Sequence, residues 1–253
     1  MFFDGDERMI KSYGISKTGL VRKVNEDCIF AGDKSYFILA DGMGGYEGGQ
    51  VASTTAVEAA CRSLDGADPS SYSEAQVKEA VCAANRAILH KKVETENLQH
   101  MGTTMIIAVI SGNVLYWGHV GDSRLYVLYK GNLTQITKDH SFVMTLVDEG
   151  KITKEEMREH PRKNEITRAV GIAPQLDVDT GHLDLAPHMV VLICSDGVSA
   201  LLDDVCIKDL LLPLENKEVD LKTAAEQILR KVYDAGATDN TSIILIQSDE
   251  DEL

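Results

Sequence analysis

The apolar residues of this chain fall into short runs with a strand period, and the runs follow one another in hairpin-like groups. They do not alternate with helical segments in the way that builds a parallel sheet. The pattern therefore predicts an α+β fold with antiparallel strands. We expect six strands: Tyr36–Ala40, Thr103–Ile110, Val114–Val120, Arg124–Tyr129, Met189–Cys194 and Thr241–Ile246. Only SGN and GDS separate the three strands between residues 103 and 129, so these three are interpreted as one meander.

Helical periodicity marks three other segments. Residues 73–94 start with Ser73 and Gln76 at the spacing of a capping box. Residues 219–236 place apolar side chains on one face and end in a glycine, as many helices do. A third helix is expected after the glycines of residues 42–49, where alanine recurs every four residues.

Residues 139–175 differ from their surroundings. They are charged, short of strand signals and poor in apolar anchors, and they lie between two groups of strands. The length of 253 residues suits one large domain or two small ones, and no linker or repeat divides the rest of the chain. We predict a single domain, residues 1–253, with a mobile flap at residues 139–175 inserted in it.

Charge and composition exclude several classes of function. A net charge of −15 argues against nucleic-acid binding, which requires lysine and arginine. No apolar run reaches 18 residues, and the N-terminal segment has acids where a signal peptide would be apolar. Five scattered cysteines fit reduced thiols. We expect a cytoplasmic monomer with no membrane contact.

Three aspartates stand at the ends of strongly apolar strands. Asp41 follows YFILA and precedes the glycine-rich GMGGYEGG, and Asp196 follows MVVLICS. Asp239 comes just before the strand at residues 241–246, so an antiparallel arrangement brings all three to one rim. Their repulsion at ~4 Å would cost several kcal/mol unless a divalent cation removed it. Oxygen ligands of this kind select Mg²⁺ or Mn²⁺, and glycine lets backbone carbonyls such as that of Gly42 approach the ion.

Two further groups of polar residues allow two interpretations each. Arg22, Glu26 and Asp27 are either a solvated turn or an arginine fork for phosphate beside acidic groups of a metal shell. Asp122, in GDS, is placed at a hairpin tip, where an ordinary turn residue is the simpler interpretation.

Six motifs in order give the chain a resemblance to a known family. RKVNED, ADGMGG, MGTTM, VGDSRLY, CSDGV and TDNTS resemble the motifs of the metal-dependent protein phosphatases, the type 2C class. The match runs from about residue 13 to residue 246, and the compact bacterial members that partner serine/threonine kinases are the most similar in shape.

The resemblance implies a central antiparallel β-sandwich flanked by helices on both faces, in four layers. It implies two Mn²⁺ or Mg²⁺ ions, bridged by Asp41, with Asp196 and Asp239 on the first ion and the Gly42 carbonyl on the second. Glu26 and Asp27 would hold metal-bound waters, and Arg22 would bind the substrate phosphate. A third ion would lie near Asp122 and share Asp196.

The activity implied is hydrolysis of phosphoserine and phosphothreonine in proteins, with direct attack by a metal-bridging water or hydroxide. The partners implied are phosphoproteins, including a bacterial serine/threonine kinase. Many eukaryotic members carry histidine where this chain has Met43, so the general acid is open, and metal-bound water is the first candidate. His140, at the start of the flap, is interpreted as a surface side chain.

Two other classes of function remain as alternatives. A pseudophosphatase would bind phosphoproteins without turnover, but the intact set of Asp41, Asp196 and Asp239 argues against it. An aspartyl-phosphate enzyme would use Asp41 as its nucleophile, but such enzymes usually have a second aspartate at the position of Met43.

Overall fold

Two antiparallel sheets packed face to face form the centre of the protein. The computed structural model describes residues 9–45 and 47–249, so the expected domain limits at residues 1 and 253 lie outside the described residues. One sheet has the strand order β1-β11-β10-β7-β8 and the other β2-β3-β5-β6-β9, with the short β4 paired to β3. The strands are β1 Ile10–Lys17, β2 Asp27–Ala31, β3 Tyr36–Met43, β4 Gly102–Thr103, β5 Met105–Ser111, β6 Val114–Val120, β7 Arg124–Tyr129, β8 Asn132–Gln135, β9 Asp179–Asp184, β10 Val190–Cys194 and β11 Thr241–Ser248.

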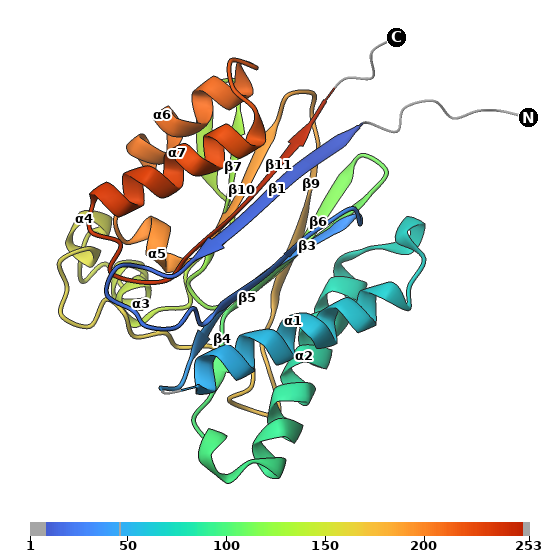
Figure 1. The fold of residues 1–253 in the computed structure, drawn as a ribbon, viewed down its shortest axis with the longest axis vertical. Helices are drawn as coiled ribbons and strands as arrows, with labels where there is room; N and C mark the ends of the chain where they lie inside the picture. The colour runs from blue at the N-terminus through green and yellow to red at the C-terminus, as the bar shows by residue number, and fades with distance from the viewer. Residues whose placement is uncertain (1–8, 46, 250–253) are drawn as a thin grey trace, which may run out of the picture.

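Helices cover the outer face of each sheet (Figure 1). α1 and α2 lie on the sheet that contains β3, and α6 and α7 lie on the sheet that contains β11. The predicted four-layer α/β/β/α architecture is therefore confirmed. The helices are α1 Gly48–Asp65, α2 Glu74–Glu94, α3 Phe142–Asp148, α4 Lys154–Met157, α5 Asp196–Ser199, α6 Asp204–Glu215 and α7 Leu221–Asp234, with 3-10 turns η1 Pro69–Ser71 and η2 Glu96–Leu98.

The strand period explains the layers. In β3 the side chains of Phe37 and Leu39 point into the sandwich, whereas Ile38 and Ala40 face the helices α1 and α2. In β11 Ile244 and Ile246 face inward, and Ile243 and Leu245 face α6 and α7. Both faces of these strands are buried, which is why YFILA and IILI are apolar throughout rather than alternating.

The strand meander predicted for residues 103–129 is wrong in its second half. β5 and β6 form a hairpin, but β7 pairs with β8 and β10 in the other sheet. Gly121–Ser123 is therefore a crossover between the sheets, and GDS is not a hairpin tip. The physical reason is that the face-to-face core also takes inward side chains from β7, among them Leu125 and Val127.

The expected helices are present, with one local difference at the start of α2. Ser73 is the N-cap residue, but its hydroxyl contacts the Gln76 side chain and makes no capping bond to the backbone, so the predicted capping box does not form. Among the described residues, no helix is both long and apolar enough to cross a bilayer.

The segment predicted as a flap carries α3 and α4 and has its own small apolar cluster. Val143, Met144 and Met157 are buried together, with Phe142, Val147 and Ile152 packed around them. The expectation of few apolar anchors is therefore wrong for this segment. In Figure 1 α3, α4 and α5 lie at the same end of the sandwich.

Candidate metal centre

The last residues of β3 bring backbone and carboxylate oxygens to one end of the sandwich. Asp41 is followed by Gly42, where an added Cβ atom would lie 2.1 Å from the carbonyl oxygen of Gly49 and 2.5 Å from that of Glu26. No side chain fits in that space, so only glycine lets the β3 backbone pass this close to its neighbours.

The register of β10 and β11 places two more aspartates at the same end. Cys194 pairs with Ile243, so Asp196 follows the end of β10 beside the point where Asp239 precedes the start of β11. This antiparallel arrangement was predicted. Asp41, however, belongs to the opposite sheet, so the three acids meet across the sandwich rather than along the rim of one sheet.

These residues line one cleft with a cavity of about 260 Å³. Its lining includes Arg22, Glu26, Asp41, Gly42, Met43, Thr104, Asp122, Asn164, Asp196 and Asp239. Arg22 donates a hydrogen bond from its guanidinium to the Asp239 carboxylate at 2.6 Å. The arginine thus stands at the cleft with a carboxylate partner, and it is not simply a solvated turn residue.

Asp27 lies beneath the cleft rather than on its surface. It pairs with Asp41 across β2 and β3, and its side chain is buried. One carboxylate oxygen, Oδ2, accepts hydrogen bonds from the hydroxyls of Ser195 at 2.9 Å and Ser242 at 2.6 Å. The other, Oδ1, has no hydrogen-bond partner among the described residues, and the same holds for Oε1 of Glu26.

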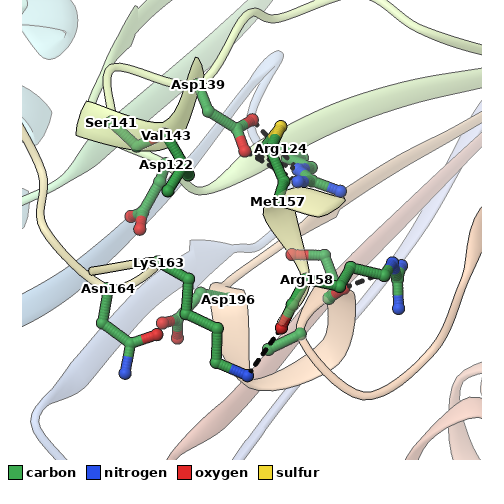
Figure 2. Close-up of a pocket in the computed structure, with 12 residues that line it drawn as sticks. Asp122, Arg124, Asp139, Ser141, Val143, Met157, Arg158, Lys163, Asn164 and Asp196 are labelled. Atoms are coloured by element: carbon green, nitrogen blue, oxygen red, sulfur yellow. Dashed lines mark hydrogen bonds and ion pairs between the residues drawn. The ribbon is translucent and has the colours of Figure 1, made fainter. Parts of the chain in front are cut away.

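Asp122 enters the cleft from the crossover between β6 and β7. Figure 2 shows its carboxylate opposite that of Asp196, across a second, smaller cavity of about 80 Å³ that adjoins the first. Asn164, from the segment between β8 and β9, lies beside Asp196. Asp122 is half-buried and points into a cavity, so its interpretation as a hairpin-tip turn residue is wrong.

Burial and mutual repulsion raise the pKa of the acids in the cleft. Burial lifts the pKa of Asp41 well above its usual value, and the charges of Asp27, Asp196 and Asp122 lift it further. Burial, with repulsion from Asp196, raises the pKa of Asp122 to about 8. The pKa of Asp196 is also raised, by burial and by Asp239. Burial raises the pKa of Asp27 to about 6.

The cleft fits a divalent cation with oxygen ligands. It holds several carboxylates that repel one another, buried oxygens without partners, and a glycine at which the backbone comes close. Within residues 9–45 and 47–249, no group of three or more His, Cys, Asp or Glu side chains is placed to hold a metal ion by itself, so waters or backbone oxygens would have to complete the shell of a bound ion. Mg²⁺ usually keeps several waters and takes few protein ligands.

Comparison with known sequences decides the family. Residues 22–240 match the family described as Protein phosphatase 2C, and this range runs from the arginine of the cleft to the residue after Asp239. The chain belongs to the protein phosphatase 2C family. The predicted resemblance is thereby confirmed.

Several relatives in this family are bacterial. The chain is 39% identical over 239 residues to the serine/threonine protein phosphatase PstP of Mycobacterium tuberculosis, which covers 91% of this chain and 43% of PstP. It thus spans less than half the length of that relative. It is 31% identical over 236 residues to the serine/threonine phosphatase Stp of Listeria welshimeri, and the match covers 90% of this chain and 92% of Stp. The structure of the PstP catalytic domain in complex with two manganese ions superposes on this chain with a TM-score of 0.85 and 34% sequence identity. The match covers 95% of this chain and 99% of the PstP chain.

Two residues of the family motifs have positions that the sequence did not predict. The Thr104 hydroxyl accepts a hydrogen bond from the Asp41 N–H at 3.0 Å, and the Thr104 N–H donates to the Asp41 carbonyl at 2.9 Å. The buried Asn240 amide accepts from the Glu26 N–H and donates to the Val24 carbonyl. The polar motifs MGTTM and TDNTS beside apolar strands were the available signal.

His140 is the other misplaced prediction. Its side chain is only 5% exposed, so it is not a surface histidine. Its ring nitrogens bond to Gly121 and to Asp179, next to the crossover that carries Asp122. The charged sequence around His140 gave no sign of this burial.

Proposed function

We propose that this chain is a metal-dependent protein serine/threonine phosphatase that hydrolyses phosphoserine and phosphothreonine. The observation that carries the proposal is the convergence of Asp41, Asp122, Asp196 and Asp239 with Arg22 on one cleft. Membership of the protein phosphatase 2C family and the two manganese ions bound by a PstP structure support it.

Named residues would hold the ions. Asp41 would bridge two of them, with Asp196 and Asp239 on one ion and the Gly42 carbonyl on the other. Glu26 and Asp27 would orient ligands from behind, and Asp122 would take part in a third position with Asp196. When bound, paired Mn²⁺ or Mg²⁺ ions lower the pKa of a shared water and neutralise phosphoryl oxygens.

The chain's own side chains have separate tasks in this proposal. Arg22 would bind the phosphate by donating hydrogen bonds to it, because its guanidinium is exposed at the cleft and its bond to Asp239 leaves other N–H groups free to donate. Asp27 would stay in place through its bonds to Ser195 and Ser242. Met43 lines the cleft and has no proton to give, so water would protonate the leaving serine oxygen.

The substrate class implies the partners. A phosphatase of this kind consumes phosphoproteins, so a protein kinase must supply them, and we propose a bacterial serine/threonine kinase as the opposing enzyme. The expected setting is the cytoplasm, and the expected state is a monomer with the flap at residues 139–175 beside the cleft.

The test is hydrolysis of phosphoserine and phosphothreonine peptides with and without added Mn²⁺. We expect phosphate release that depends on the metal and is lost after chelation. Full turnover after verified metal removal would contradict the mechanism. Metal binding without turnover of any phosphopeptide or phosphoprotein would favour a pseudophosphatase instead.

A further inference from the structure

The short crossover at Gly121–Ser123 pairs with no strand among the described residues, yet side chains hold it on both sides. On one side Ser123 is buried, and its hydroxyl lies 2.8 Å from that of Thr104. Thr104 is the residue that also bonds the backbone of Asp41. Asp122 is therefore tied at its C-terminal neighbour to the strand end that carries the central acid of the cleft.

On the other side His140 binds both backbone groups of Gly121. The His140 N–H donates to the Gly121 carbonyl at 2.7 Å, and the Gly121 N–H donates to Nδ1 of the His140 ring at 3.1 Å. Gly121 has φ +115°, and a Cβ atom there would lie 2.6 Å from Thr104. The crossover thus needs glycine at this position. The backbone N–H of residue 140 satisfies the Gly121 carbonyl, and the His140 ring satisfies the Gly121 N–H.

The hydrogen bonds also assign the proton on the His140 ring. Because Nδ1 accepts from Gly121, the proton of the neutral ring lies on Nε2, which donates to the Asp179 carboxylate at 3.1 Å. Burial lowers the pKa of His140 and favours this neutral form. The ring packs on that of His119, with centroids 4.6 Å apart, and His119 stands opposite Asp179 in the pairing of β6 and β9.

The same histidine reaches the segment that returns from α4. Its carbonyl accepts a hydrogen bond from the Thr167 N–H at 2.7 Å. Arg168, the next residue, donates to the second oxygen of Asp179 at 2.7 Å. His140, Thr167 and Arg168 all belong to the predicted flap, residues 139–175, so hydrogen bonds connect Gly121 to His140 at the start of the flap and, through it, to the part of the flap that returns from α4.

We propose that His140 is a positioning residue for Asp122. It fixes the Gly121 backbone and with it the direction in which the Asp122 carboxylate enters the cleft. Its bonds to Thr167 and, through Asp179, to Arg168 couple that direction to the part of the flap that returns from α4. The consequence for cation binding rests on the proposed function, because it requires Asp122 to be a ligand. The two hydrogen bonds between His140 and Gly121, called the clamp below, do not depend on that role.

The first experiment measures the clamp itself on metal-free protein, by NMR hydrogen exchange of the Gly121 amide. In His140→Ala we expect exchange about tenfold faster, because one hydrogen bond is lost. In His140→Asn the Oδ1 atom takes the place of the Nδ1 acceptor, so exchange stays within about threefold of the original protein. The control is His182→Asn, which removes a comparable histidine–carboxylate contact, His182 with Glu74 at 2.7 Å, on an exposed side chain of β9.

A merely structural role would give a different pattern. General destabilisation raises exchange throughout β5 and β6, whereas the clamp predicts a rise confined to residues 121–123. If His140→Ala does not fold, His140→Phe keeps a ring against His119 and removes the acceptor, and the same local rise is expected. Unchanged Gly121 exchange in either folded variant overturns the proposal.

The second experiment measures the consequence, by calorimetric titration with Mn²⁺. We expect His140→Ala to weaken the lowest-affinity class of sites ten- to hundredfold while the tighter sites keep their affinity. Asp179→Asn should act in the same direction with a smaller effect, and His182→Asn should have none. An unchanged isotherm in His140→Ala overturns the coupling to Asp122.

A further variant separates this proposal from the proposed function. If Asp122→Asn itself leaves Mn²⁺ binding and turnover unchanged, Asp122 is not a ligand, and that part of the proposed function fails. The exchange of Gly121 then still decides whether His140 holds the crossover.

Discussion

Two groups of acids face the same cleft, but different forces hold them in place. Asp41 lies in β3 and pairs with Asp27 of β2, and Asp196 and Asp239 lie next to the paired ends of β10 and β11, so the hydrogen-bond ladders of two sheets set their positions. Asp122 lies on the crossover between β6 and β7, which belong to different sheets, so no ladder joins the two strands that flank it. Thr104 bonds one of its neighbours and His140 bonds the other.

The difference indicates which part of the site is rigid and which can be tuned. A change in the register of β3, β10 or β11 would turn every buried side chain of that strand to the wrong face, so the packing of whole strands fixes where these acids lie. Moving Asp122 requires the loss of only a few hydrogen bonds. We therefore expect Asp41, Asp196 and Asp239 to hold the ions that hydrolysis requires. We expect the crossover to be the place where the flap changes the position of Asp122 and with it the activity.

The largest expected effect comes from Asp41. Asp41→Asn should lower phosphatase activity on every substrate at least about a thousandfold, because the bridging ligand and several kcal/mol of electrostatic stabilisation are lost. The measurement is turnover of a small phosphate ester and of a phosphopeptide. Asp65→Asn is the matched control, since Asp65 also precedes a glycine but lies at the exposed end of α1. Substantial activity in Asp41→Asn would break the distinction between the two groups.

Arg22 is expected to have the next largest effect. Arg22→Ala removes a charged hydrogen-bond donor to phosphate, so kcat/KM should fall roughly ten- to a hundredfold while Mn²⁺ affinity changes little. Lys23→Ala, which removes the neighbouring exposed charge, is the control. Kinetics equal to those of the original protein would return Arg22 to a structural role as the partner of Asp239.

Asp122 should separate metal binding from turnover. Asp122→Ala should keep two ions per chain, because it leaves the strand-end ligands in place, and should lose activity on phosphoproteins about tenfold or more. Metal content and turnover are measured on the same sample. An Ala variant with normal activity and normal Mn²⁺ binding would mean that Asp122 only fills the crossover.

Metal removal should reverse the pH dependence of stability. Without metal, Asp122 has a folded pKa of about 8 against about 3.9 unfolded, so the folded state binds more protons between these values. Stability should then rise as the pH falls from 8 to 6, by about 1 kcal/mol or more, or roughly 2–4 °C in Tm. With saturating Mn²⁺ the trend should reverse, since protons compete with the cation. Thermal unfolding with and without chelator measures both pH trends. A metal-free Tm that falls as the pH is lowered from 8 to 6 would contradict the raised pKa of Asp122.

The smallest effect concerns motion of the flap. We expect amides of α3 and α4 to exchange faster than those of β10, because their apolar cluster is small compared with the sandwich core. Equal protection in both regions would show that the segment is part of the rigid body and would weaken its role as a flap.

The sequence by itself determined the strand-end acids and the layers. Apolar runs such as YFILA and IILI are buried on both faces, so their composition and length mark them as central strands. The positions of Asp41, Asp196 and Asp239 at the ends of such runs, with Gly42 after the first, were therefore predictable. The edge strands β1, β2, β8 and β9 were missed. The residues of β1, β8 and β9 are more polar, which weakens the strand period, and β2 has only five residues.

Only the tertiary structure decided which sheet each strand joins and what holds Asp122. The hairpin of β5 and β6 suggested that β7 would continue the same sheet, but β7 crosses to the other sheet and adds its inward side chains to the core. His140 and Gly121 are 19 residues apart, and Thr104 and Ser123 are also 19 apart, so no local pattern connects them. A periodic signal reports only how one segment meets its surroundings, whereas a crossover is fixed by the unpaired backbone groups that distant side chains come to satisfy.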